Sequence, residues 1–142
     1  MAGTDEVERI ARGLIDRTLP KAQWNHRAHF AAALWLLEHP DVLARSGGMG
    51  PIIRAYNEST GVANTGTSGY HETITHASMR GAAAVRAQCP GEPLGRVIDT
   101  LMAGELGDKR WPFAYWSEMR LMSVEARRHW VEPDLAPLPW SE

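Results

Sequence analysis

The stretch His26–His39, HRAHFAAALWLLEH, decides which class of fold to expect. Its apolar residues recur three and four positions apart, which is the spacing of one face of an α-helix. Asn25 precedes the stretch as a helix N-cap, and Pro40 follows it, where a helix has to stop. Its longest clean apolar run, FAAALWLL, is far too short to cross a bilayer. The stretch therefore predicts a buried helix of a soluble protein.

Similar signals predict helices on both sides of this stretch. They place helices at residues 4–19 (with Thr4 as N-cap), 50–60, 70–88, 93–103 and 113–130, and a short helical turn at 40–48. No segment alternates apolar and polar residues for long enough to make a convincing strand. The proline-spaced residues 131–139 are expected to lie extended over the body. We therefore expect an all-α, compact bundle of about six to seven helices, forming a single domain over residues 1–142, with a Pro-rich C-terminal tail.

Composition restricts the possible partners and the compartment. The chain of 142 residues is 44% hydrophobic and 23% charged, which are ordinary globular values and argue against disorder. A net charge of −2 without a long basic run argues against nucleic acid or an anionic membrane as the main partner. The one cysteine excludes an intrachain disulfide and a Cys-rich zinc site. The N-terminus lacks the order of a signal peptide, so we expect a cytoplasmic protein.

Three histidines are candidates for a common site. His26 and His29 continue the apolar stripe of their helix, so both are expected to face inward on neighbouring turns. His71 begins a second stripe in the 70–88 helix, and helices packed side by side can bring the three rings together. The positive end of a helix disfavours imidazolium, so His26 and His71 should be neutral, as metal ligands must be. Glu72 lies at the edge of the same face, where it could be a fourth ligand, a hydrogen-bond acceptor for one of the ligands, or a general base acting on a metal-bound water.

The segment SGYHETITH, Ser68–His76, suggests at first the HExxH motif of zinc proteases, but its spacing excludes that class. HExxH needs histidines four positions apart on one helical face. His71 and His76 are five apart, which turns the second ring about 140° away from the first. His76, His39 and His129 are each better explained as solvated or structural side chains. The neighbouring NTGTSG tract lacks the spacing and lysine of a phosphate-binding P-loop, so an ordinary loop is the better interpretation.

As a set, WNHRAHFAAALWLL, YNESTGVANTGTSGYHETIT, YWSEMRLMSVEAR and WVEPDL resemble an uncharacterised family of small bacterial proteins. The family pattern is a Trp-x-His-x-x-His helix followed by a Tyr-Asn, Asn-Thr and Gly-Tyr-His-Glu-Thr-Ile-Thr segment. It falls here on Trp24, His26, His29, Tyr56, Asn57, Asn64, Thr65, Gly69, Tyr70, His71, Glu72, Thr73 and Thr75. The resemblance covers most of the chain. It implies a functional site at these positions but no particular reaction.

Two functions follow as hypotheses. In the first, His26, His29 and His71 hold one transition-metal ion, which could be zinc, iron, copper or nickel. Glu72 would then move a proton or complete the coordination. A small polar substrate would be bound and oriented by Trp24, Tyr56, Asn57, Asn64 and Tyr70. The expected reaction is hydrolysis, hydration or lyase-type proton transfer, or an oxidation with iron or copper. A metal-free variant would use the same histidines and Glu72 as acid and base.

The second hypothesis is a non-catalytic helical module that binds a ligand or forms a homodimer. Here the histidines and Glu72 form a buried hydrogen-bond network that fixes the register of the helices. Against it, leucine or phenylalanine would fill the same space without polar atoms that need partners. This favours a functional site over simple packing but leaves both hypotheses open.

Overall fold

Helices follow one another along almost the whole chain. The computed structural model describes residues 2–140, with side chains from residue 6 onward. The α-helices in this range are α1 (Ala2–Asp16), α2 (His26–Glu38), α3 (Pro40–Arg45), α4 (Met49–Ser59), α5 (Glu72–Gln88), α6 (Leu94–Ala103), α7 (Glu118–Leu121) and α8 (Val124–Arg128). Short 3-10 turns lie at η1 (Lys21–Gln23), η2 (Glu105–Gly107) and η3 (Trp111–Ala114). No strand occurs between residues 2 and 140, so the prediction of an all-α fold is confirmed.

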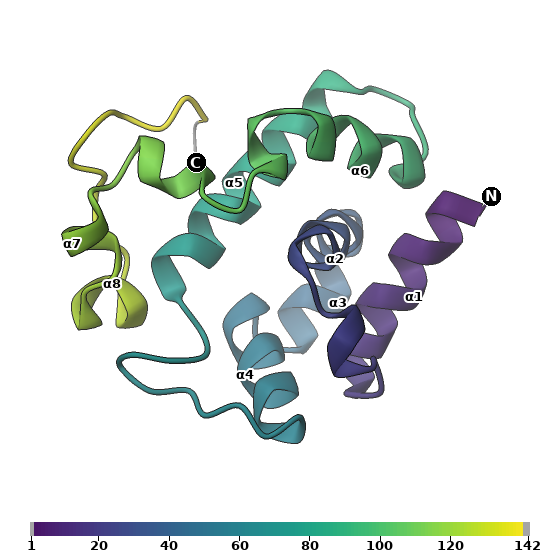
Figure 1. The fold of residues 1–142 in the computed structure, drawn as a ribbon. Helices are drawn as coiled ribbons and strands as arrows, with labels where there is room; N and C mark the ends of the chain where they lie inside the picture. Colours follow the sequence, from purple (N-terminus) through teal and green to yellow (C-terminus); the bar gives the residue numbers. More distant parts are fainter. Residues whose placement is uncertain (1, 141–142) are drawn as a thin grey trace.

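α2 is the central helix, with α1, α5 and α6 packed around it (Figure 1). Every residue from Ala31 to Leu36 is buried, because this part of the helix is apolar all round. The predicted start of the helix is confirmed. The side-chain oxygen of Asn25 accepts a hydrogen bond from the backbone N–H of Ala28 at 2.9 Å, which satisfies one of the free donors of the first turn.

α1 is longer at its start and shorter at its end than predicted. It begins at Ala2, so Thr4 lies inside the helix, and the side chain of Thr4 is outside the described part. The helix stops at Asp16 because Arg17 takes a positive φ of 61°. The N–H groups of Thr18 and Leu19 then turn back to the carbonyl oxygen of Gly13, at 2.9 and 3.1 Å. This pattern closes a helix before the proline that follows.

The single helix predicted for residues 113–130 is wrong. The structure has η3, α7 and α8 there, which raises the number of α-helices in the described residues to eight. Ser117 and Ser123 both have extended backbone, with ψ near 154° and 156°, and each side chain caps the helix that follows. Serine competes with the helical backbone for hydrogen bonds and therefore favours caps over helix interiors. The two helix boundaries were not predicted, because the apolar residues keep helical spacing across both serines.

α5 begins two residues later than predicted, because His71 is its N-cap. The chain enters α5 through the loop of residues 60–71, which runs along the lower edge of the molecule in Figure 1. Within it, Asn64 Oδ1 accepts hydrogen bonds from the Tyr70 N–H and from Asn57 Nδ2, both at 3.0 Å. Gly69 has a φ of +80°, and a Cβ there would lie 2.6 Å from the same Asn64 oxygen. The loop is therefore held in one conformation.

The C-terminal tail lies over the body, as predicted. The Leu135 N–H donates to the carbonyl oxygen of Tyr115 at 2.9 Å. Further on, the Trp140 ring packs against Trp111 and Tyr115, with centroids 5.6 and 5.9 Å apart. In the part of the chain that is described, no helix has the length and apolar character needed to span a bilayer.

Candidate functional site

A cavity of about 340 Å³ lies where α2, α4, the 60–71 loop and α5 meet; we call it the His29 cavity. It is lined by Trp24, His29, Ile53, Asn57, Val62, Gly69, Tyr70, His71, Ile74 and Thr75. Five of the nine predicted site residues are among them: Trp24, His29, Asn57, Tyr70 and His71. The other four are His26, Tyr56, Asn64 and Glu72. The sequence therefore predicted about half of one cavity wall.

His29 lies on the cavity wall with both ring nitrogens free of hydrogen bonds to the described residues. Its ring stacks on Trp24, with centroids 3.9 Å apart and planes 19° apart. Its side chain is solvent-accessible, so the prediction that His29 faces inward is wrong. Within residues 6–140 neither ring nitrogen has a side-chain or backbone hydrogen-bond partner. Helix periodicity placed the ring near the core, but the cavity opens at that point.

The electrostatic surroundings of His29 keep its ring neutral. Crowding by protein atoms around the cavity lowers the pKa of His29 to about 4, and repulsion from His26 adds to the effect. The ring is both accessible and crowded because it lines a concave surface, where water reaches one side and protein surrounds the others. A neutral imidazole has one donor and one acceptor nitrogen. At neutral pH, His29 therefore offers the cavity a free hydrogen-bond acceptor.

His26 is half-buried and is fixed by a contact outside the cavity. Its Nε2 lies 2.7 Å from the carbonyl oxygen of Leu106 in η2. Because a carbonyl oxygen only accepts, Nε2 carries the proton. The ring also meets Phe30 edge to face, with centroids 5.4 Å apart. The contact with Leu106 links the start of α2 to η2, which is a structural role.

His71 uses both ring nitrogens to hold the protein together. The Ile74 N–H donates to Nδ1 at 3.2 Å, which caps α5. On the other side of the ring, Nε2 donates to the carbonyl oxygen of Leu121 at 2.7 Å, which ties α5 to α7. Burial lowers the pKa of His71, and the nearby charge of Arg127 lowers it further. His71 is therefore neutral, as predicted, but neither nitrogen is left for a metal ion.

These contacts bear on the predicted metal centre. Among the described side chains, no group of three or more His, Cys, Asp or Glu residues is placed to hold a metal ion. His26 and His71 point hydrogen bonds at backbone carbonyls of different elements, whereas His29 faces the cavity. The structure thus lends no support to a centre formed by these three residues. Binding of zinc, iron, copper or nickel stays a prediction.

Glu72 belongs to a neighbouring cavity of about 330 Å³, which it shares with Arg54, Thr75 and His76. The Tyr70 hydroxyl donates to Glu72 Oε1 at 2.6 Å. Burial and this bonded carboxylate both raise the pKa of Tyr70, so the phenol stays protonated. Tyr70 lines both cavities. The predicted role of Glu72 as a catalytic acid or base is not tested, but Glu72 does not line the cavity that holds His29.

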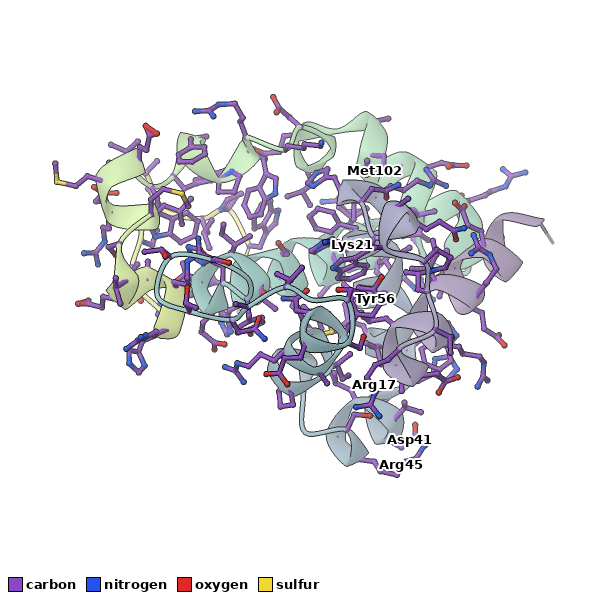
Figure 2. The ribbon with its side chains drawn as sticks, turned by 60° about the horizontal axis from the view of Figure 1, so that its bottom comes forward. Arg17, Lys21, Asp41, Arg45, Tyr56 and Met102 are labelled. Atoms are coloured by element: carbon purple, nitrogen blue, oxygen red, sulfur yellow. The ribbon has the colours of Figure 1, made fainter. Side chains whose placement is uncertain are left out.

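The other polar residues predicted to bind substrate have different roles. Tyr56 is fully buried, lies inside the molecule in Figure 2, and donates to the carbonyl oxygen of Leu19 at 2.8 Å. Its ring packs edge to face against Trp24, with centroids 5.6 Å apart. Both ends of the Asn64 amide form hydrogen bonds within the protein, because its Nδ2 also donates to the Arg54 carbonyl oxygen at 3.1 Å. Asn57 remains on the cavity wall.

The apolar part of the cavity was not predicted as a site. Ile53 and Ile74 line it from α4 and α5, and Val62 lines it from the loop. Isoleucines at helical spacing predict core, and the sequence carries no signal for the few that border a hollow. The approach of Val62 depends on the fold of the loop, which becomes evident only in three dimensions.

No protein-family model matches the chain, and comparisons with curated proteins and with solved structures likewise gave no match.

Proposed function

We propose that the protein binds a small, partly apolar molecule in the His29 cavity, and that the ligand donates a hydrogen bond to the neutral ring of His29. The observation that carries this proposal is an imidazole, on the wall of a cavity of about 340 Å³, to which no other described residue forms a hydrogen bond. That volume lies near the lower end of the range for small-ligand pockets, roughly 300–1,000 Å³. The ligand class is therefore one of small molecules with a hydroxyl or N–H group.

The lining of the cavity supports this choice of ligand. Trp24, Ile53 and Val62 provide apolar and aromatic surface, which favours a ligand with an apolar body. Few polar groups line the same space, and the His29 ring has no hydrogen-bond partner among the described residues. Small-ligand sites commonly combine such walls with a small number of placed polar groups. The stack on Trp24 fixes the plane of the His29 ring, so whichever nitrogen accepts does so within a defined plane.

A binding role is better supported than acid–base catalysis. General bases work best when their pKa is close to the pH at which the enzyme operates. His29 has a pKa of about 4 and is therefore a weak base at neutral pH. Glu72, the other predicted acid or base, lines a different cavity. Metal-dependent catalysis would need the three predicted histidines to converge, and two of them have ring nitrogens bonded to backbone carbonyls.

The test compares two ligands of nearly the same shape, phenol and toluene, of which only phenol has a donor. Each is titrated into ¹⁵N-labelled protein, and the affinity is taken from the shifts of amide signals around the cavity. We expect phenol to bind up to about tenfold more tightly than toluene, because a neutral hydrogen bond contributes about 0.5–1.5 kcal/mol. Both compounds should shift the same signals, including those of Ile53 and Ile74.

Two variants serve as test and control. In His29→Phe the ring still stacks on Trp24 but has no acceptor, so the preference for phenol should disappear while toluene still binds. His39→Phe is the matched control, because His39 also stacks on a tryptophan, Trp35, at 3.8 Å and 15°. The control should keep the preference. Equal binding of phenol and toluene by the unaltered protein, or no binding of either, would refute the proposal.

A further inference from the structure

Three arginines converge on a second cavity, of about 220 Å³, beside the 60–71 loop. Arg54 reaches it from α4, whereas Arg127 and Arg128 reach it from the end of α8. The loop contributes the remaining lining. We call this group the arginine pocket, and its members are Arg54, Asn64, Thr65, Tyr70, Arg127 and Arg128. Tyr70 separates it from the His29 cavity, since it lines both.

The positive charge of the arginine pocket is not balanced by the described part of the chain. Other arginines form ion pairs, such as Arg27 with Glu6 at 3.1 Å and Arg12 with Glu8 at 2.9 Å. Among the described side chains, Arg54, Arg127 and Arg128 form none within 4.0 Å. Three like charges around one small cavity repel each other. Their arrangement would be stabilised by a bound anion.

Two of the arginines are fixed by contacts that leave part of each guanidinium group available. The Arg54 guanidinium lies over the Tyr70 ring, 4.6 Å from its centroid. Arg127 donates one Nη–H to the carbonyl oxygen of Gly69 at 3.0 Å. Its Nε is buried and has no hydrogen-bond partner among the described residues. A guanidinium that is already held in place loses less freedom when it binds an anion.

Glu72 and Glu125 form no ion pair with the arginines of the pocket. Glu72 shares the neighbouring cavity with Arg54, but its carboxylate accepts the hydrogen bond of the Tyr70 hydroxyl and forms no ion pair with Arg54. Glu125, on α8, is exposed and forms no ion pair with Arg128 among the described residues. Among the described residues no carboxylate pairs with these arginines, so a bound anion would supply the missing negative charge.

From this convergence of three unpaired arginines on one cavity we infer that the arginine pocket binds a phosphate group. Guanidinium groups match the oxygens of phosphate and of carboxylate by paired hydrogen bonds. Phosphate is favoured here because it carries about two negative charges near neutral pH, against one for a carboxylate. The Thr65 hydroxyl, on the same wall, can donate to a further oxygen. The NTGTSG tract thus lines the proposed anion site with Asn64 and Thr65, whereas the positive charges come from α4 and α8. The site does not have the geometry of a P-loop.

The experiment titrates the full chain with inorganic phosphate and follows binding by calorimetry and by ¹⁵N NMR. We expect saturable binding of one phosphate per chain, weaker at high salt because part of the attraction is screened. The NMR shifts should centre on residues 64–70 and 124–128. Arg54→Gln and Arg128→Gln change exposed side chains, so both variants should fold. Each should weaken binding about tenfold or more, because hydrogen bonds to charged groups are stronger than neutral ones.

Arg45→Gln is the matched control. Arg45 is an exposed arginine at the end of α3, labelled in Figure 2, and lines none of the three cavities described here. Its substitution removes the same charge and should leave phosphate binding unchanged. Phenyl phosphate and acetate complete the set. Tighter binding of phenyl phosphate would assign the site to a phosphorylated molecule, and tighter binding of inorganic phosphate to the free ion. Acetate binding as tightly as phosphate, no saturable binding, or equal losses in all three variants would overturn the inference.

Discussion

Replacement of His71 separates a structural histidine from a functional one. His71 is buried, caps α5 through Nδ1 and donates from Nε2 to the carbonyl oxygen of Leu121. If these two bonds are its role, the main effect of His71→Ala is a loss of stability. If its role were to hold a metal ion, the main effect would be the loss of the ion.

The expected magnitude follows from the two bonds. Loss of a helix N-cap costs about 0.5–2 kcal/mol. Leaving the Leu121 carbonyl oxygen buried without a donor costs about 1–3 kcal/mol more. We therefore expect His71→Ala to lower the free energy of unfolding by about 1.5–5 kcal/mol. Asparagine is also a good N-cap but is too short to reach Leu121, so His71→Asn should cost only the second part.

The assay is urea unfolding followed by circular dichroism, with His129→Ala as the control. His129 is exposed, so its substitution should change the free energy of unfolding by less than about 0.5 kcal/mol. Elemental analysis of protein purified without a His-tag or chelator accompanies the assay. A His71→Ala variant as stable as the unaltered chain would contradict the structural role of His71. So would about one equivalent of a transition metal that is bound by the unaltered chain and lost in this variant.

Two further predictions concern pH and the loop. Because the folded chain keeps His29 and His71 neutral, the unfolded chain binds protons more readily as the pH falls from 6.5 to about 4. The contribution of these two histidines to the free energy of unfolding should therefore be fully present above pH 6.5 and decline below it in urea titrations, less steeply in His29→Phe. A profile without this decline would contradict the neutral state of the two rings. Gly69→Ala should lower the free energy of unfolding by about 1–3 kcal/mol, because Gly69 has a φ of +80° and a Cβ would collide with the loop. In Gly61→Ala, the control, φ is +82° but the space is open, so its urea midpoint should fall less; equal losses would mean that the collision does not matter.

The parts of the fold that were predicted correctly are those governed by local rules. The start of α2 follows from Asn25, and its end from Pro40, because capping and proline act within a few residues. The end of the chain shows the limit of this reasoning. Ser117 and Ser123 interrupt a stretch whose apolar residues still follow helical spacing. A serine inside such a pattern is compatible with either a helix interior or a cap, and tertiary contacts decide between them.

The candidate site was harder to predict than the fold, because it depends on which atoms are already bonded. His26, His29 and His71 are equally good metal ligands in a sequence. In the structure they differ because the carbonyl oxygens of Leu106 and Leu121 accept hydrogen bonds from His26 and His71. Both partners lie at least 50 residues away along the chain. Periodicity describes which face a residue is on, but it carries no information about such distant partners.

The same physics that suggested a metal site explains why the histidines have other roles. A histidine at the start of a helix is kept neutral by the positive end of the helix and by burial. This neutrality is a condition for binding a metal ion. A neutral imidazole is equally suited to accept one hydrogen bond and donate another, as His71 does between Ile74 and Leu121. Neutrality alone therefore does not separate a ligand from a structural residue. What separates them is whether a nitrogen remains free at a cavity, and among the three predicted histidines this points to His29.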